Sequence, residues 1–265
     1  MTPAATPSLT PRFPTELRRW RRVRGLSQLD LAIRAGTTQR HVSFIEQGRS
    51  RPGRGVVLRL AASLELPLRE RNDLLVAAGF APAFPESPLD DDALAPVRHA
   101  LDTILDGHLP YPAVVVGPAG TLVTANRAFD LFLEGVDPAL LAPPVDLFRL
   151  ALDPRGYARR VRNLPVWGRH VTASLRGRIA RRPDPSLEAL LVELEGYLPP
   201  LPAHDDDVLG FAVPLELDSR DGELRLITTL TSFATATDVT LAELHLEAFL
   251  PADDRTAEVL RRRWG

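Results

Sequence analysis

The stretch from Leu26 to Gly48, LSQLDLAIRAGTTQRHVSFIEQG, restricts the fold more than any other part of the chain. Ser27 is a favourable N-cap, and Asp30 follows it at close to the spacing of a capping box. Gly36 and Gly48 stand where a helix needs a residue with positive φ in order to end. The stretch therefore predicts two short helices joined by a tight turn.

Apolar residues of this stretch fall on one face of each predicted helix. Leu31, Ala32 and Ala35 share a face of the first helix, and Val42 and Ile45 form a narrow stripe on the second. Two small amphipathic helices that cross through small residues are typical of the helix-turn-helix unit, which lays its second helix in the DNA major groove.

The pattern LSQxxLAxxAGTTxxxVSxIEQGRSRP resembles the XRE or phage-repressor type of helix-turn-helix domain over about residues 16–80. This resemblance implies an all-α, five-helix DNA-binding domain, which we place at residues 15–80. In this type, the arginine at the place of Arg21 pairs with the glutamate at the place of Glu46. The resemblance therefore implies an ion pair between the first and third helices. The first helix is expected at Glu16–Arg24, with Leu17, Trp20 and Val23 facing inward.

Polar residues around the second helix of the motif are predicted to contact DNA. Glutamine suits the N6 and N7 edge of adenine, and arginine suits the O6 and N7 edge of guanine. By resemblance, Gln39 and Arg40 are the main base-reading residues. The other predicted contacts, to phosphates or nearby bases, are Gln28, Thr37, Thr38, Ser43, Arg49, Arg51 and Arg54. The alternative is that all nine are simply exposed polar residues.

Charge is divided unevenly along the 265 residues, a length that allows one large domain or two small ones. Residues 1–80 hold 14 arginines and 6 acidic residues, which gives a net charge of +8. Residues 81–265 hold 18 arginines and 28 acidic residues, which gives a net charge of −10. A basic first third indicates a module that faces nucleic acid, and an acidic remainder indicates a module that avoids it.

Several classes of protein and site find no support in the sequence. The chain has no cysteine, which excludes disulfides and thiolate metal sites. No apolar run approaches the ~18 residues that span a bilayer, and the first residues lack the pattern of a signal peptide. We therefore expect a cytoplasmic protein without membrane contact. Because hydrolase, zincin, P-loop and dinucleotide-binding motifs are missing, we predict no enzyme, no metal and no cofactor.

Proline-rich composition marks two segments between or before the domains. Residues 1–14 contain four prolines and are expected to form a disordered arm. Residues 81–92 contain three prolines and an acidic cluster, and are expected to form a linker. The second domain is then expected at residues 93–265.

The second domain shows the pattern of strands, then helices, then strands. Two apolar runs around a Gly/Pro turn, Ala113–Val116 and Thr121–Ala125, predict a hairpin. The four-residue recurrence of apolar residues from Trp167 to Ile179 predicts a longer helix. Further helices are expected at Ala93–Leu105, Ala128–Leu133, Val145–Leu150 and Ser186–Leu194, and strands at Leu209–Leu217, Glu223–Ser232 and Leu241–Phe249. This layout predicts an antiparallel sheet covered by helices, an α+β fold.

This order of elements, with PAVVV and TLVTANRAF early and GELRLITTL late, resembles the PAS-like ligand-binding domain of MmyB-like regulators over about residues 93–263. Members of that family are regarded as transcription regulators that respond to small molecules. Cavities between a sheet and its helices are mostly apolar, so a lipid-like or fatty-acid-like ligand is expected. The candidate pocket residues are Phe129, Phe132, Phe148, Trp167 and Phe211 as walls, and Asn126 and Arg169 as polar anchors. Ordinary core packing is the alternative for each of them.

Taken together, these patterns predict a transcription regulator that binds a double-stranded DNA operator as a homodimer. A ligand would change the operator affinity by binding two arrangements of the protein unequally. Two alternatives are a regulator whose C-terminal domain only dimerises and an enzyme that carries a DNA-binding module.

Overall fold

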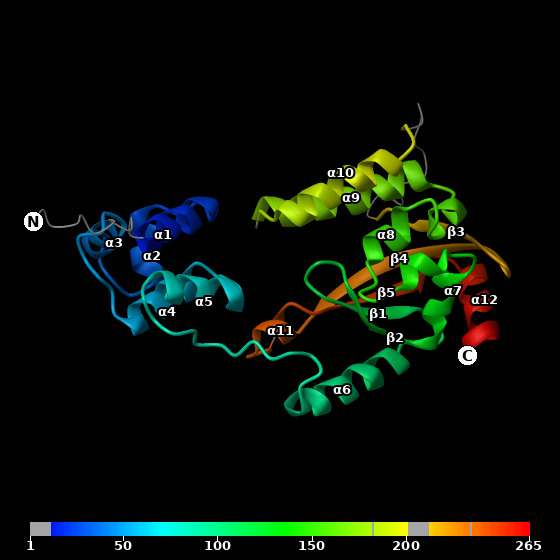
Figure 1. Cartoon of the computed structure of the whole chain (residues 1–265), viewed down its shortest axis with the longest axis horizontal. Coiled ribbons are helices and arrows are strands. Elements are labelled where there is room, and N and C mark those ends of the chain that lie inside the picture. The colour runs from blue at the N-terminus through cyan, green and yellow to red at the C-terminus, as the bar shows by residue number, and fades with distance from the viewer. Residues whose placement is uncertain (1–11, 182, 201–211, 234) are drawn as a thin grey trace, which may run out of the picture. The chain divides into compact units, whose positions relative to one another are not determined.

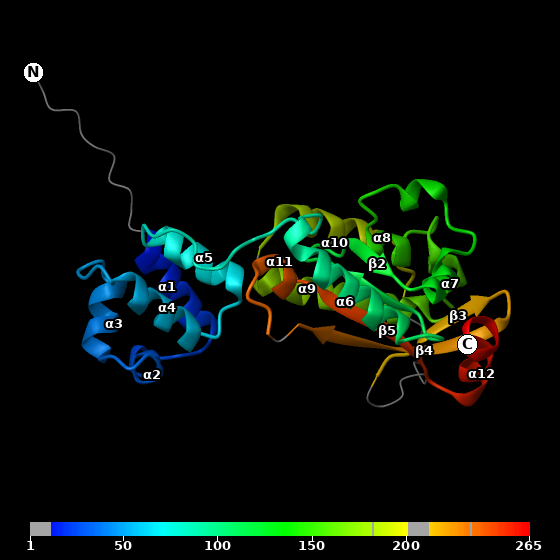
Figure 2. The ribbon, with the colours of Figure 1, turned by 90° about the horizontal axis from the view of Figure 1, so that it is seen from below.

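The chain forms two units, which Figures 1 and 2 show from two directions. The computed structural model describes residues 12–181, 183–200, 212–233 and 235–265. One unit, here called the N-terminal unit, comprises Met1–Pro88 together with Ala234–Ala242. The other, the C-terminal unit, comprises Leu89–Phe233 and Glu243–Gly265. None of the helices in the described ranges has the length and apolar character that a membrane crossing requires.

Helices pack around a single apolar core in the N-terminal unit (Figure 2). They are α1 (Arg12–Val23), α2 (Gln28–Arg34), α3 (Gln39–Glu46), α4 (Arg54–Ser63) and α5 (Leu68–Ala77), and the short α11 (Val239–Ala242), which contacts α5, also belongs to this unit. The first five agree with the predicted five-helix domain. Leu17, Leu31, Ile45, Leu60 and Leu74 are fully buried in this core.

Local signals in the helix-turn-helix stretch are confirmed. The Ser27 side chain accepts a hydrogen bond from the Asp30 backbone, and the Asp30 carboxylate accepts one from the Ser27 backbone, which completes a capping box. Thr38 caps α3 with its side chain. Gly36 and Gly48 adopt φ values of +61° and +70°, which side chains other than glycine rarely tolerate.

The start of α1 differs from the prediction. Residues 12–14 of the predicted disordered arm form the first turn of α1, and residues 1–11 lie outside the described residues. Phe13 is 4% exposed and packs in the core, so the buried stripe of α1 is shifted one turn toward the N-terminus. As a result Val23, which was expected to face inward, is 55% exposed.

A five-stranded antiparallel sheet forms the centre of the C-terminal unit, with the strand order β2-β1-β5-β4-β3. The strands are β1 (Ala113–Val116), β2 (Leu122–Ala125), β3 (Leu215–Ser219), β4 (Gly222–Ser232) and β5 (His245–Pro251). Both predicted hairpins form, β1 with β2 and β3 with β4. The last strand, β5, inserts between them and pairs with β1 and β4.

Two predicted strands begin later than expected. The strand predicted at Leu209–Leu217 begins at Leu215, and its residues 209–211 lie outside the described residues. The strand predicted at Leu241–Phe249 begins at His245, because Val239–Ala242 forms α11 instead.

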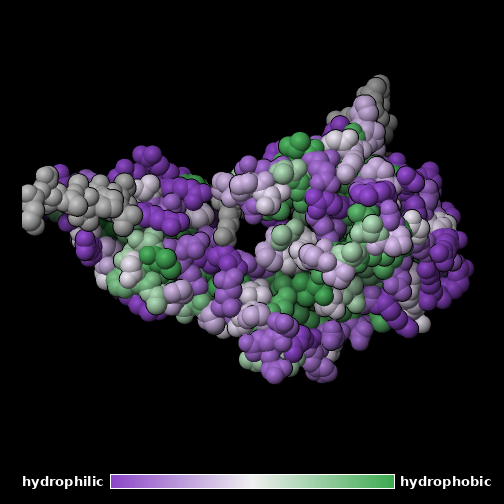
Figure 3. Space-filling model, viewed as in Figure 1, coloured by the Kyte–Doolittle hydropathy of each residue, from purple (hydrophilic) through white to green (hydrophobic). Residues whose placement is uncertain are grey.

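Helices cover both faces of this sheet (Figures 1 and 2). One face is covered by α7 (Asp130–Leu133), α8 (Leu147–Leu152), α9 (Leu164–Arg181) and α10 (Pro185–Tyr197). On the other face, α6 (Ala95–Asp106) packs on β1 and β2, while α12 (Asp254–Trp264) packs on β4 and β5. Short 3-10 turns lie at Asp92–Leu94, Arg127–Phe129, Pro138–Leu141 and Tyr157–Arg160. The predicted α+β layout is confirmed. In the view of Figure 3, apolar surface of this unit gathers around the strands, between α9 and α10 on one side and α6 on the other.

The two ends of α1 offer a test of the shifted stripe. Phe13→Ala should lower the free energy of unfolding by about 3 kcal/mol or more, because it removes a buried aromatic ring and leaves a cavity. Val23→Ala should change it by less than about 0.5 kcal/mol, because that side chain is mostly exposed. Urea unfolding of the full chain measures both. A larger loss for Val23→Ala than for Phe13→Ala would restore the original prediction.

Candidate nucleic-acid interface and ligand cavity

The buried carboxylate of Glu46 joins α1, α2 and α3. Glu46 is 3% exposed at the end of α3. Arg21 of α1 binds it with two hydrogen bonds, Nε to Oε1 at 2.6 Å and Nη2 to Oε2 at 2.9 Å. Gln28 of α2 donates its side-chain amide to Oε2 at 2.9 Å, and Arg18 donates to the Glu46 backbone carbonyl. The pairing of Arg21 with Glu46 expected from the resemblance is confirmed.

The participation of Gln28 was not anticipated. Its side-chain amide was predicted to face a phosphate, but one of its N–H groups is used by Glu46. The amide therefore has a contact within the protein that positions α2 against α3.

Electrostatics favour a charged carboxylate at this site. Burial pushes the pKa of Glu46 upward, but hydrogen bonds from Arg21 and Gln28 and the charges of Arg21 and Arg18 outweigh it, so the pKa is lowered. The hydrogen bond to Glu46 is also the main reason that the pKa of Arg21 is raised. Both groups are thus charged at neutral pH, and α3 is held by a charge-assisted pair.

The first turn of α3 presents polar side chains to solvent. Val42 and Ile45 are fully buried, whereas Gln39 and Arg40 are exposed. The Arg40 guanidinium lies 5.1 Å from the centroid of the Phe44 ring, a cation–π contact that restrains the side chain without neutralising it. The structure thus brings the two predicted base-reading residues together on one exposed surface.

The other predicted DNA contacts surround this turn. Thr37 precedes Thr38, the N-cap of α3, and its hydroxyl is 2.9 Å from Nδ1 of His41. Ser43 accepts a hydrogen bond from the side chain of Gln47, which follows the last residue of α3. Arg49 and Arg51 follow α3 and are exposed, and Arg54 begins α4 with a long contact of 3.5 Å to the Pro82 carbonyl. Apart from Gln28 of α2, the predicted set therefore lies on α3, on the two threonines just before it and on the chain that leaves it.

Several of these arginines have charges available for a partner. Among the described residues, Arg40, Arg49 and Arg51 form no ion pair with an acidic side chain. In contrast, Arg18 and Arg21 are paired with Glu46. Unpaired guanidinium groups beside an exposed helix turn can neutralise phosphates.

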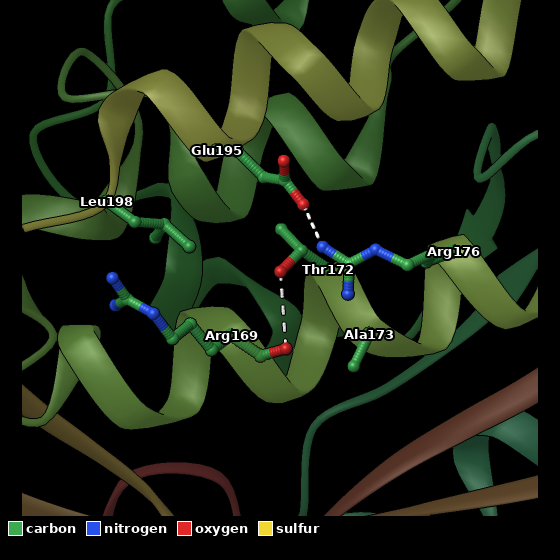
Figure 4. Close-up of a pocket in the computed structure, with 6 residues that line it drawn as sticks. All are labelled: Arg169, Thr172, Ala173, Arg176, Glu195 and Leu198. Carbon is green, nitrogen blue, oxygen red and sulfur yellow. Dashed lines mark hydrogen bonds and ion pairs between the residues drawn. The ribbon is translucent and has the colours of Figure 1, made fainter. Parts of the chain in front are cut away.

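A cavity of about 450 Å³ opens between α9 and α10 in the C-terminal unit (Figure 4). Its lining residues are Arg169, Thr172, Ala173 and Arg176 of α9, Glu195 of α10, and Leu198. Arg169 is held in place because its Nη1 donates to the carbonyls of Pro165 and Pro199, both at 2.9 Å. Arg176 reaches across the cavity and pairs with Glu195 (Figure 4). The lining carries two positive charges and one negative charge, which suits an anionic group.

Of the predicted pocket residues that the structure describes, only Arg169 lines this cavity. Phe129, Phe132 and Trp167 belong instead to a packed aromatic core with Tyr157 and Phe249. The ring centroid of Phe132 lies 5.2 Å, 5.0 Å and 4.6 Å from those of Phe129, Tyr157 and Phe249. These rings pack against one another in the core, and they do not line the cavity between α9 and α10. The spacing of Arg169 and Arg176, two turns apart on one helix, is the signal that could have found the cavity.

The two other predicted wall residues also lie apart from the cavity lining. Phe148 packs at the edge of the core, with the Arg178 guanidinium 5.9 Å from its ring centroid. Phe211 lies outside the described residues.

Asn126, the other predicted polar anchor, is held by hydrogen bonds within the C-terminal unit. It is buried, and its Oδ1 accepts from the Ala113 backbone at 3.1 Å. Its Nδ2 donates to the carbonyls of Leu105 and Tyr111 at 3.0 Å and 2.9 Å. Because both amide N–H groups are used, the side chain ties α6 to the start of β1 and has no donor left for a ligand.

Titratable groups in the core of the C-terminal unit are scattered. Burial raises the pKa values of Tyr157 and Glu247 and lowers that of His245, so it favours the neutral form of each. In the part of the chain that the structure describes, no three His, Asp or Glu side chains are grouped to hold a metal ion. The cavity is therefore the candidate ligand site in this unit.

Comparison with protein families assigns both parts of the chain. Residues 97–262 match the domain family described as MmyB-like transcription regulator ligand binding domain. Residues 13–74 match the family described as helix-turn-helix domain. No curated protein matches the chain.

Three solved structures share limited similarity with the chain. The restriction-modification controller protein C.AhdI from Aeromonas hydrophila is 33% identical over 23% of this chain and 91% of its own, with a TM-score of 0.22. The hypothetical transcription factor NHTF from Neisseria is 27% identical over 28% of this chain and 86% of its own, with a TM-score of 0.23. An RNA-binding light-oxygen-voltage receptor is 13% identical over 99% of this chain and 69% of its own, with a TM-score of 0.26. Since these TM-scores lie below 0.5, the three likenesses by themselves assign neither fold nor function.

A comparison of two ion pairs tests the anchoring of α3. A double-mutant cycle with Arg21→Ala and Glu46→Ala should give a coupling free energy of about 2 kcal/mol, because each single change leaves a buried charged partner. The same cycle on Arg19 and Glu16, whose side chains are 42% and 34% exposed, should give about 0.5 kcal/mol or less. Urea unfolding of the full chain measures both cycles, and equal couplings would contradict the anchoring role.

The same carboxylate predicts a pH dependence of stability. Because the pKa of Glu46 is lower in the folded chain, its contribution is complete above the unfolded pKa and is lost as the pH falls through the folded pKa. Glu46→Gln should therefore reduce the free energy of unfolding most at neutral pH, and the difference from the natural chain should shrink below about pH 4. Unfolding at pH 7 and at about pH 3 measures this change. A difference that does not shrink in acid would show that the carboxylate charge is not the cause.

Proposed function

Because the chain belongs to the family of MmyB-like transcription regulators, with a helix-turn-helix domain ahead of the ligand-binding domain, we propose that it binds operator DNA with an affinity set by a small molecule. The observation that carries the DNA-binding role is the anchoring of α3. Glu46 fixes the end of that helix to α1 and α2, and the first turn exposes Gln39 and Arg40. A rigid helix with exposed polar side chains at its start suits direct reading of base edges.

Each predicted contact residue has a role in this proposal. Gln39 reads adenine and Arg40 reads guanine, since each presents a bidentate partner for that base. Arg49 and Arg51 neutralise phosphates beyond α3. The remaining contacts to backbone or nearby bases are assigned to Gln28, Thr37, Thr38, Ser43 and Arg54, with Gln28 acting mainly through its backbone.

Domain roles follow from the same proposal. Residues 15–80 form the DNA-binding domain, residues 81–92 the linker, and residues 93–265 the domain that binds the ligand and dimerises, except for the part that belongs to the N-terminal unit. A homodimer places two α3 helices on half-sites about 34 Å apart. Two half-sites give a small reading helix the affinity that one cannot reach alone.

The ligand is an amphiphile with an anionic head, such as a fatty acid. The cavity volume of about 450 Å³ lies within the range of small-molecule sites. Arg169 and Arg176 suit a carboxylate head, while Ala173 and Leu198 give an apolar contact.

Two glutamines test base reading: Gln39 is the first residue of α3, and Gln47 follows its last residue. Binding sites selected from random DNA by the full chain give the reference duplex. Gln39→Ala should weaken binding to that duplex by about 1–3 kcal/mol and relax the preference at one base pair. Gln47→Ala, just beyond the other end of the helix, removes a hydrogen bond to Ser43 but no predicted base-reading side chain, so it should have little effect. Fluorescence anisotropy with the selected duplex and with single-base variants measures both.

An arginine variant serves as the second comparison. Arg51→Ala should weaken the selected duplex and random DNA alike and reduce the salt dependence of binding by about one unit of slope. Equal losses on selected and random DNA for Gln39→Ala would remove Gln39 from the base-reading set.

Ligand binding is tested with dodecanoate and with dodecanol as an uncharged analogue of the same length. Dodecanoate should bind more tightly and should change the affinity for the selected duplex. Arg176→Gln should weaken dodecanoate roughly three- to tenfold, whereas Glu195→Gln, which removes the competing carboxylate, should strengthen it. Isothermal titration calorimetry measures these affinities.

Arg162→Gln is the matched control, since Arg162 is also an exposed, paired arginine but lies away from the cavity. Binding that is equal for the acid and the alcohol and unchanged in Arg176→Gln would exclude the cavity as the site of an anionic head. No binding at all would favour the alternative in which the C-terminal domain only dimerises.

A further inference from the structure

The connection between β4 and β5 belongs to the N-terminal unit, although both strands belong to the C-terminal sheet. The last pair of these strands joins Ser232 to His245. Between them, Ala234–Ala242 is grouped with Met1–Pro88. We call its described part, residues 235–242, the strap. The chain thus passes from the sheet into the N-terminal unit and back within a dozen residues.

Two hydrogen bonds, one between backbone groups and one from a backbone N–H to a side chain, hold the strap within the N-terminal unit. The Val239 N–H donates to the Pro85 carbonyl at 2.8 Å, and the Ser87 N–H donates to Asp238 Oδ2 at 3.1 Å. The other carboxylate oxygen, Oδ1, accepts from the Thr240 N–H at 2.8 Å and so caps α11. Val239 is fully buried and Asp238 is 6% exposed. Because these residues are buried and their polar groups are hydrogen-bonded, the strap is an ordered part of the N-terminal unit.

The segment that receives the strap is itself clamped to α5. Asn72 of α5 accepts from the backbones of Ala83 and Phe84 at 2.9 Å and 3.1 Å, and donates to the Phe84 carbonyl at 2.8 Å. In turn, α5 packs on α1, and α1 carries the Arg21 side chain that holds Glu46 of α3. A continuous set of contacts therefore runs from the strap to α3.

The half of β4 next to the strap is held less firmly than the rest of that strand. The adjoining half of β5 is paired on both sides, because His245–Ala248 also pairs with β1. From Thr228 to Ser232, β4 is exposed, and among the described residues this half of β4 pairs with β5 alone, because β3 reaches only to Leu226. Strands with few buried contacts open and shift at low cost in free energy.

Helix α9 relates this end of the sheet to the cavity. The same helix that lines the cavity with Arg169 and Arg176 carries Arg178, which donates to the Pro118 carbonyl. Pro118 follows β1 by two residues, and Val116, the last residue of β1, pairs with His245, the first residue of β5. These contacts connect α9 to the beginning of β5 through the end of β1.

From these contacts we infer that the strap couples the cavity to the DNA-reading helix: a ligand that alters α9 shifts the β4–β5 end, and the strap transmits the shift through residues 83–87 and α5. This inference rests on the proposed function. Linkage makes the coupling reciprocal, so DNA bound to α3 must bias the β4–β5 end to the same degree.

Two substitutions undo the docking while keeping the strap itself. Val239→Pro removes the N–H that donates to Pro85, at the first helical position, where proline is tolerated. Asp238→Asn replaces the oxygen that accepts from Ser87 by an amide group that cannot accept, while its remaining oxygen can still cap Thr240. The control is Asp137→Asn, the same change at a cap in the C-terminal unit.

Amide hydrogen exchange and DNA binding of the full chain test the inference. In the natural chain the Ser87 and Val239 amides should be protected, the selected duplex should alter exchange at His245–Leu250, and dodecanoate should change duplex affinity about fivefold or more. In the double variant Asp238→Asn/Val239→Pro both effects should fall toward none. Its affinities for duplex alone and for dodecanoate alone should stay within about threefold of the natural chain. The Asp137→Asn chain should behave as the natural one.

The outcomes separate this inference from the proposed function. Unprotected Ser87 and Val239 amides, or a double variant that keeps the natural response, would overturn the role of the strap while leaving DNA binding intact. A duplex that alters β5 exchange in the natural chain but not in the double variant supports the strap even when dodecanoate is not the ligand. If no duplex is selected at all, the proposed function fails and this inference fails with it.

Discussion

The buried carboxylate of Glu46 is the interaction on which the placement of α3 depends. Side chains from α1 and α2 bind it, so α3 cannot rotate or slide without losing charge-assisted hydrogen bonds. Held in this way, the helix buries Val42 and Ile45 and leaves Gln39 and Arg40 in solvent. Reading a base edge requires donors and acceptors within about 3 Å of their partners, so a rigid helix is a precondition for that role.

In the C-terminal unit, the corresponding constraint is the insertion of β5 between two hairpins. The strap directly precedes β5 in the chain and belongs to the N-terminal unit. The polypeptide therefore connects the sheet to the strap, which contacts α5. A regulator needs two arrangements that a ligand can distinguish. We propose that the exposed end of β4, which among the described residues pairs with β5 alone, takes part in two such arrangements, and that a ligand binds in the cavity beside α9.

Much of the N-terminal unit could be predicted because its signals are local. Caps such as Ser27 and Thr38, and glycines at positive φ, act within a few residues and are readable in the sequence. Phe13 was missed because prolines on either side suggested a disordered arm, whereas its ring is buried by residues far along the chain. Spacing likewise indicates that Phe129, Phe132 and Trp167 are apolar and face inward, but it does not show that their neighbours fill the space around them.

Sequence by itself determined the helix-turn-helix, the two hairpins, the α+β layout and the family, since capping, glycine placement and apolar periodicity operate over a few residues. Tertiary structure alone decided that Gln28 and Arg21 both bind the Glu46 carboxylate and that the cavity lies between α9 and α10. It also decided that the connection between β4 and β5 belongs to the N-terminal unit. The contact between Ser87 and Asp238 spans 151 residues. Its energy depends on burial and geometry created by the whole fold, and no local pattern carries that information.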